Sequence, residues 1–69
     1  MTRKEGNMLV KLKGKRVEKG LTQLDIAKKL NMAVSTYNFK ENGRAEFSMT
    51  ECIEIMKILN CTFEEIFLQ

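Results

Sequence analysis

Three features of the 69-residue sequence indicate an all-α domain of five helices. Proline is absent, and aromatic residues make up only 7% of the chain. Apolar residues recur three and four positions apart, which is the spacing of one helix face. Three hydroxyl residues are each followed, three positions later, by an acidic residue, a pattern that caps helix N-termini. The predicted helices span about residues 7–19, 22–30, 33–41, 48–59 and 62–68.

The first helix, at 7–19, follows residues 1–6, which are predicted to form a flexible basic tail. The single domain is therefore expected to span 7–69. Gly20 stands just beyond the predicted end of this helix, where a left-handed closing residue is favoured. Gly43 has the same place after the helix at 33–41, and Asn31 and Asn60 are the next-best residues for that conformation.

Capping boxes mark the beginnings of the helices at 22–30, 48–59 and 62–68. In each box the two side chains accept hydrogen bonds from each other's backbone N–H groups. The pairs are Thr22 with Asp25, Ser48 with Glu51, and Thr62 with Glu65. The helix at 33–41 differs, because Ala33 stands at its cap position and has no side chain that could accept a bond. The missing cap costs about 1 kcal/mol.

The predicted core combines the apolar face of the helix at 48–59 with apolar residues from the other helices. Each large side chain that is fully buried contributes about 1.5 to 3 kcal/mol. The expected members are Leu9, Leu12, Leu21, Ile26, Ala27, Leu30, Tyr37, Phe47, Cys52, Ile55, Met56, Leu59, Phe63 and Ile66.

The charges are unevenly distributed along the chain. Residues 1–45 hold eleven Lys and Arg against four acidic residues, whereas residues 46–69 hold one against five, for a net charge of +3. A positive region on a small domain is typical of a protein that binds a polyanion such as nucleic acid. An ordinary solvated helix face has the same composition, so charge alone leaves both interpretations open.

Metal, cofactor, membrane and enzyme functions are not expected. Cys52 and Cys61, without any histidine, provide too few ligands for a zinc site, and both are expected to be reduced thiols in the core. The apolar stretch Met8 to Val10 is too short for a signal or a membrane span, so a cytoplasmic protein is expected. No pattern of a nucleophile with a base, or of a phosphate-binding loop, indicates an enzyme or a small-molecule substrate.

Residues 21–44, LTQLDIAKKLNMAVSTYNFKENGR, read as two short helices separated by a turn around Asn31, with the small Ala27 at their crossing. Together with LKGKRVEKGLTQ, ENGRAEFSMTECIEIMKIL and FEEIF, in order and at matching spacing, this segment resembles phage-type members of the Cro and repressor (XRE) family of helix-turn-helix proteins. The resemblance covers nearly the whole chain. It implies a compact five-helix bundle of the lambda repressor-like DNA-binding type, acting as a small transcriptional regulator, most commonly a repressor.

The resemblance also implies which residues contact bases. In this family the helix at 33–41 enters the major groove, and its exposed early positions meet base edges. These positions are Val34, Ser35, Asn38 and Phe39. Asn38 is expected to pair bidentately with adenine, which discriminates by about 1 to 3 kcal/mol. Val34 and Phe39 are expected to contact thymine methyl groups, with partial burial of Phe39 against the helix at 48–59 as the alternative.

Contacts to the DNA backbone are implied for Gln23, Thr36, Lys40, Asn42, Arg44 and Arg16. Gln23 lies in the first turn of its helix, where the helix N-terminus favours a phosphate. Arg16 and Glu41 correspond to an ion pair that would turn Arg16 towards a phosphate. An exposed pair contributing at most about 1 kcal/mol is the alternative. For Asn42 and Arg44 the alternative is a helix C-cap with a solvated cation.

A homodimer bound to a double-stranded, two-fold operator is expected, because one short recognition helix reads few base pairs. Its interface is predicted to involve Phe67 and Leu68, and packing of both into the core is the alternative. A protein-interaction module, such as an antitoxin or an adaptor, remains a second possible function because the final third is acidic. The exposed face of the predicted recognition helix is polar and uncharged, which favours DNA binding over a protein-interaction role.

Overall fold

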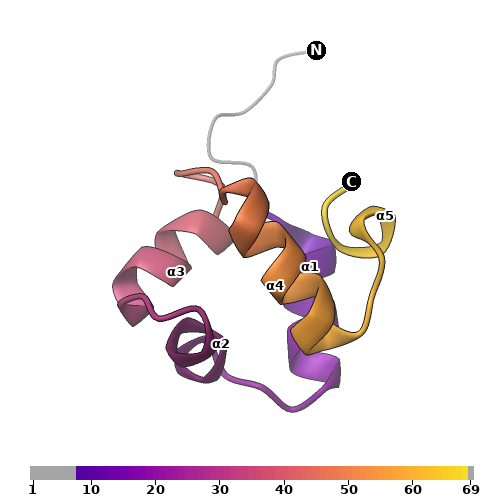
Figure 1. Cartoon of the computed structure of the whole chain (residues 1–69), viewed down its shortest axis with the longest axis horizontal. Coiled ribbons are helices and arrows are strands. Elements are labelled where there is room, and N and C mark those ends of the chain that lie inside the picture. The colour runs from indigo at the N-terminus through magenta and orange to yellow at the C-terminus, as the bar shows by residue number, and fades with distance from the viewer. Residues whose placement is uncertain (1–7, 69) are drawn as a thin grey trace.

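The computed structural model describes residues 8–68 and has five helices over that range, with no strand (Figure 1). They are α1 (Val10–Glu18), α2 (Gln23–Lys29), α3 (Val34–Glu41), α4 (Met49–Leu59) and α5 (Phe63–Ile66). The predicted all-α, five-helix fold is therefore confirmed. The predicted tail at 1–6 lies outside the described residues. Among those described, no helix has the length and apolar character needed to cross a membrane.

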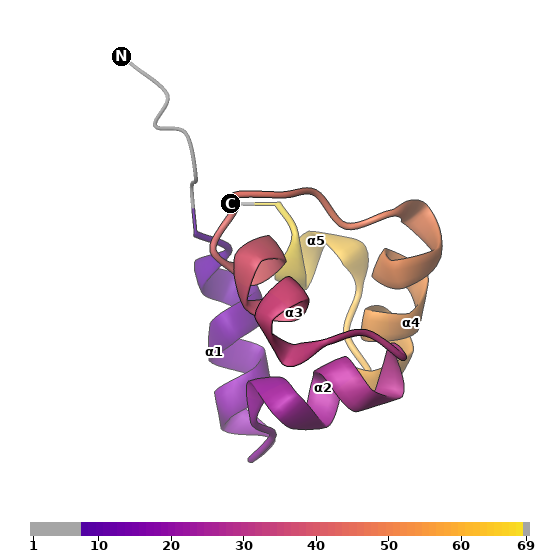
Figure 2. The ribbon, with the colours of Figure 1, turned by 90° about the vertical axis from the view of Figure 1, so that its left-hand side faces the viewer.

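The helices enclose one core, with α3 and α5 on opposite sides of it. α2 packs against α3, and α5 contacts both α1 and α4. Figure 2 shows α3 towards the viewer, with α1 and α4 to either side, α2 below and α5 behind. One outer face of the molecule therefore belongs to α3 and the start of α2.

The predicted helix starts and ends are largely confirmed. All three capping boxes are present; in the first, the Asp25 N–H donates to Thr22 Oγ1 at 3.0 Å and the Thr22 N–H donates to Asp25 Oδ2 at 2.8 Å. The four predicted closing residues all have positive φ angles: Gly20 75°, Asn31 59°, Gly43 82° and Asn60 56°.

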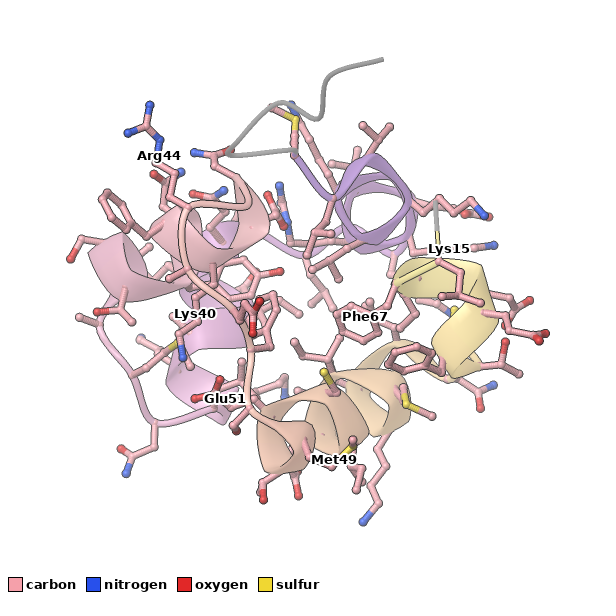
Figure 3. The ribbon with its side chains drawn as sticks, turned by 90° about the horizontal axis from the view of Figure 1, so that it is seen from above. Lys15, Lys40, Arg44, Met49, Glu51 and Phe67 are labelled. Atoms are coloured by element: carbon pink, nitrogen blue, oxygen red, sulfur yellow. The ribbon has the colours of Figure 1, made fainter. Side chains whose placement is uncertain are left out.

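Two helices differ from their predicted ranges by more than one residue at an end. α1 begins at Val10 instead of residue 7, because Leu9 supplies no side-chain cap and its N–H donates to the backbone oxygen of Glu41 at 2.9 Å. α5 is a single turn that ends at Ile66 instead of residue 68. Phe67 leaves the helix and points into the interior (Figure 3), with its ring centroid 5.9 Å from that of Phe47.

The core contains most of the predicted residues. Fully buried members are Leu12, Ile26, Ala27, Tyr37, Ile55, Leu59 and Ile66, and Cys52 is 8% exposed. The other predicted members pack against them as half-buried side chains, except Phe63. Phe63 is 40% exposed, so its prediction as a core residue is wrong. It is the first residue of α5, and in this single turn Ile66 is the residue that faces inwards.

Both cysteines are free thiols, with Cys52 buried and Cys61 half-buried. Two charged residues, Arg16 and Glu41, are buried as well, and composition alone does not predict this.

The N-terminus of α3 gives a testable stability prediction. Ala33 has the extended backbone of an N-cap (φ −68°, ψ 148°) but makes no side-chain cap bond. Ala33→Ser should therefore raise the free energy of unfolding by about 1 kcal/mol in urea denaturation, because the serine hydroxyl can accept an otherwise unbonded helical N–H. Ala45→Ser, in the exposed segment before α4, is the control and should change stability little. Equal stabilities of the two variants would contradict the prediction.

Candidate nucleic-acid interface

α2 and α3 are held together by a tight turn over residues 30–33. Asn31 takes the left-handed conformation, and the Met32 N–H donates back to the Ala27 oxygen at 3.0 Å. Ala27 itself is fully buried. A larger side chain there would force the two helices apart, so the small residue predicted at the crossing is needed for their close packing.

The exposed side of α3 carries the four residues predicted to contact bases. Val34 and Phe39 are 41% and 51% exposed, Ser35 is exposed, and Asn38 is half-buried. Phe39 is thus a surface residue and not part of the buried core. The guanidinium carbon of Arg44 lies 5.8 Å from the centroid of the Phe39 ring, within the range of a cation–π contact.

The residues predicted to contact the DNA backbone have different surroundings. Thr36 and Arg44 are exposed, and Arg44 points away from the body of the protein (Figure 3), whereas Gln23 and Asn42 are half-buried. Lys40 reaches across to α4, where its Nζ lies 2.7 Å from Glu51 Oε1. It is thus tied to a neighbouring helix, although an ammonium group has further N–H donors.

Arg16 is buried, and the predicted ion pair with Glu41 is present inside the protein. Arg16 Nε and Nη2 donate to Glu41 Oε2 and Oε1 at 2.8 and 3.1 Å, and Nη1 donates to the backbone oxygen of Leu21 at 2.9 Å. The alternative of an exposed pair is therefore wrong, since the side chains are only 8% and 1% exposed. This burial also argues against a direct contact between Arg16 and a phosphate.

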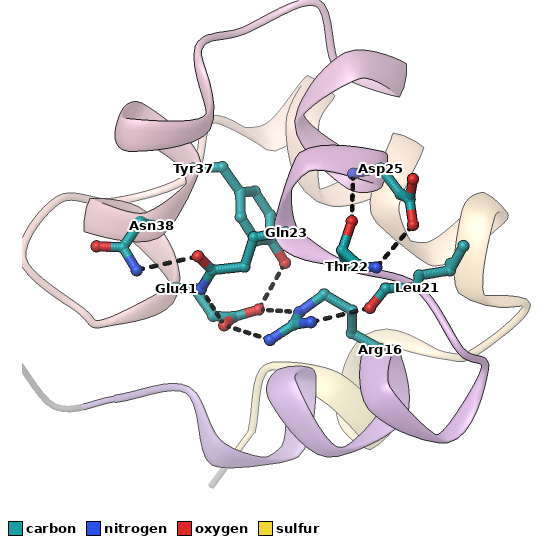
Figure 4. Close-up of polar contacts among 8 residues, drawn as sticks. All are labelled: Arg16, Leu21, Thr22, Gln23, Asp25, Tyr37, Asn38 and Glu41. Carbon is teal, nitrogen blue, oxygen red and sulfur yellow. Dashed lines mark hydrogen bonds and ion pairs between the residues drawn. The ribbon is translucent and has the colours of Figure 1, made fainter.

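Glu41 is the centre of a polar cluster that joins α1, α2 and α3 (Figure 4). Besides Arg16, the hydroxyl of Tyr37 donates to Oε2 at 2.8 Å and Nε2 of Gln23 donates to Oε1 at 2.9 Å. The cluster continues to the surface, because Asn38 Nδ2 donates to Gln23 Oε1 at 3.1 Å and Asn42 Nδ2 donates to Asn38 Oδ1 at 3.3 Å. No polar side-chain atom buried in the described part of the chain lacks a partner.

These contacts shift the pKa values of the cluster. Burial alone would raise the pKa of Glu41, but hydrogen bonds from Arg16, Gln23 and Tyr37, with the charge of Arg16, hold that pKa below its ordinary value. The hydrogen bond to Glu41 raises the pKa of Arg16 despite burial. Burial, followed by the contact with Glu41, raises the pKa of Tyr37. Near neutral pH the cluster therefore contains an ionised carboxylate, a guanidinium and a neutral phenol.

The connection between Gln23, Asn38 and Asn42 was not predicted. The i, i+4 spacing of Tyr37 and Glu41, and of Asn38 and Asn42, is a local signal that each pair shares a helix face. The link to Gln23 has no such signal, because it depends on how α2 crosses α3.

The described residues before α4 carry most of the exposed cationic side chains. Six cationic side chains of the described first part, Lys11, Lys13, Lys19, Lys28, Lys29 and Arg44, are exposed and form no ion pair with other described residues. A surface of this kind attracts a polyanion by releasing its counterions.

Comparison with known proteins agrees with this geometry. A family model described as helix-turn-helix matches residues 12–66, which includes α2, the turn and α3 together with most of α1, all of α4 and all of α5. No curated protein matches the chain.

Proposed function

Because the chain belongs to the XRE family of helix-turn-helix proteins, which are DNA-binding transcription regulators, we propose that it is a repressor of phage or mobile-element type. In this role it binds a double-stranded operator. One observation carries the proposal: α3 presents exposed side chains that are polar or apolar but uncharged, and the described residues before and after it include six exposed cations that form no ion pair. Base edges are read by uncharged donors, acceptors and apolar groups, whereas phosphates attract cations.

In the proposed complex α3 lies in the major groove. Asn38 pairs with adenine, Ser35 forms a hydrogen bond to a base, and Val34 and Phe39 contact thymine methyl groups. The exposure of Val34, Ser35 and Phe39, with Asn38 half-buried beside them, supports this arrangement.

Phosphates are contacted by Gln23, Thr36, Asn42 and Arg44, with Lys40 as an additional contact through the donors that Glu51 leaves unused. The role proposed for Arg16 is different. It holds Glu41 in place and so positions the residues at the surface, because its own guanidinium is bonded within the protein.

We also propose that two copies bind a two-fold operator, because the base contacts of one α3 cover a short site. Leu68 is 49% exposed and is available for an interface between the copies. Phe67 packs against the core, so its part in such an interface is smaller than the sequence suggested.

Selection of bound duplexes from a random DNA library at physiological salt tests the proposal. We expect a shared motif with two half-sites about 10 base pairs apart. Enrichment without a motif would leave only non-specific attraction to phosphates. Absence of binding would refute the DNA-binding role and favour a protein-interaction module.

Asn38→Ala gives a residue-level prediction on the selected operator. We expect it to lose about tenfold or more of the preference for adenine at one position of each half-site, because the bidentate pair is removed. Thr36→Ala is the control and should weaken binding to all duplexes by a similar factor, because phosphate contacts carry no sequence information. Competition binding with single-base operator variants measures both effects. An unchanged preference in Asn38→Ala would contradict the role assigned to Asn38.

A further inference from the structure

The carboxylate of Glu41 has no free acceptor position. An ionised carboxylate only accepts hydrogen bonds, and its two oxygens offer about four positions. Oε2 accepts from Arg16 Nε and the Tyr37 hydroxyl, and Oε1 accepts from Arg16 Nη2 and Gln23 Nε2. Any group that faces Glu41 must therefore donate to it.

This requirement determines which way the amide of Gln23 points. Its nitrogen must face Glu41, so its oxygen faces the opposite side, towards α3. The oxygen of Gln23 can only accept, and it therefore requires the nitrogen of Asn38, at 3.1 Å. The oxygen of Asn38 is then left on the far side, where the Asn42 amide donates to it at 3.3 Å. The oxygen and nitrogen of an amide side chain are distinguished by their partners, and here a charged group sets the first partner.

We propose that Glu41, acting through Gln23, fixes the orientation of the Asn38 amide and thereby determines which strand of the operator must carry the adenine. The inference deepens the proposed function and rests on it. Glu41 and Gln23 are positioning residues for base recognition, in addition to their place in the fold and the phosphate contact of Gln23.

The orientation matters because adenine presents an acceptor, N7, beside a donor, the N6 amino group, in the major groove. Asn38 has one N–H and one lone pair still available after its contacts with Gln23 and Asn42. Its nitrogen points towards Gln23 of α2 (Figure 4), and its oxygen accepts from the Asn42 amide. An amide held in this way fits the acceptor and donor of adenine in one order only. A T·A pair in place of A·T moves adenine to the other strand and reverses the order of its acceptor and donor across the groove, so an amide held in this orientation does not fit it.

Gln23→Met tests the chain of contacts. Methionine is similar in length but neither donates to Glu41 nor accepts from Asn38, so the Asn38 amide becomes free to turn. The wild type should prefer A·T over T·A at the Asn38 position by about tenfold, and the preference should fall to about twofold or less in Gln23→Met. Affinity for both duplexes also falls because a phosphate contact is lost, but this loss cancels in the ratio. Thr36→Val is the matched control and should retain the wild-type ratio.

Gln23→Lys is a sharper test. The lysine ammonium still donates to Glu41, so the stability of the cluster is retained, but it offers only N–H groups to Asn38. Asn38 must then turn its oxygen towards α2 and its nitrogen outwards. The preference should invert to T·A over A·T. A merely structural role of Gln23 predicts no inversion. If Gln23→Met retains the wild-type ratio, or if Gln23→Lys does not invert it, the inference is overturned.

A measurement on the free protein separates this inference from the proposed function. Hydrogen exchange of the Asn38 side-chain amide, followed by NMR without DNA, should accelerate about fivefold in Gln23→Met, because one hydrogen bond is lost. Unchanged exchange would overturn the inference even if the protein binds its operator. Accelerated exchange together with no selective binding of DNA by the wild type would instead refute the proposed function.

Discussion

Arg16→Met is expected to lower the free energy of unfolding by about 3 to 5 kcal/mol, the cost of removing one partner from a buried ion pair. Glu41 is 1% exposed and would keep its charge without the guanidinium that now balances it. Urea denaturation at pH 7 measures the effect. Because small domains are stable by only about 5 to 15 kcal/mol, the variant should be marginally folded or lose its cooperative transition. A change below about 1 kcal/mol would contradict this prediction.

The pH dependence of the free energy of unfolding provides an independent check of the role of the Arg16–Glu41 pair. In the wild type the folded-state pKa of Glu41 is below its ordinary value of 4.5, so its contribution to stability is present above that value and is lost as the pH falls through the folded-state pKa. Without Arg16, burial should raise the folded-state pKa above 4.5. Protonation then favours the folded variant as the pH falls from neutrality. The stability difference between wild type and Arg16→Met should therefore shrink on acidification towards pH 4.5.

Two further variants test whether burial of an unpaired charge causes this loss of stability. Lys15→Met removes the exposed pair in which Lys15 Nζ lies 3.7 Å from Glu18 Oε1, and it should cost less than about 1 kcal/mol. Adding Glu41→Gln to Arg16→Met should recover part of the lost stability, since a neutral amide is less costly to bury than an unpaired carboxylate.

Ile55→Ala is the second large expected effect, with a loss of about 2 to 5 kcal/mol. Ile55 is fully buried, and its truncation leaves a cavity that the neighbouring helices can fill only in part. Ile53→Ala, two residues earlier in the same helix, is the matched control because that side chain is 43% exposed. Thermal or urea unfolding of both variants gives the comparison. Similar losses at the two positions would contradict the prediction that packing of Ile55 in the core determines the effect.

Features that depend on neighbours along the chain were predictable from the sequence. A capping box joins residues three positions apart, so Ser48 with Glu51 can be recognised without knowledge of the fold. The same is true of Asn31 and Asn60, whose short polar side chains tolerate a positive φ angle. The error at Phe63 arose because an apolar residue at a helix start fits the pattern of a core face as well as that of an exposed first turn.

Features that depend on contacts between distant residues were less predictable. Arg16 and Glu41 are 25 residues apart, and only the resemblance to a known family suggested their pairing. Their burial was not predicted, because charged residues are rarely buried unless paired. The bond between Gln23 and Asn38 requires the positions of two helices, which no local pattern provides. The candidate base contacts remain predictions, supported by the exposure of α3.

The contact between Lys40 and Glu51 has a consequence for how the protein opens locally. The same oxygen of Glu51 accepts from Lys40 on α3 at 2.7 Å and from the N–H of Ser48 at 2.9 Å. One carboxylate oxygen of Glu51 therefore takes part in the N-terminal cap of α4 and also binds Lys40 near the end of α3. Unwinding of the first turn of α4 would remove the Glu51 partner of Lys40, and outward movement of α3 would withdraw Lys40 from Glu51. Fraying of one helix and displacement of the other are thus coupled, which favours a cooperative opening over independent motion of the recognition helix.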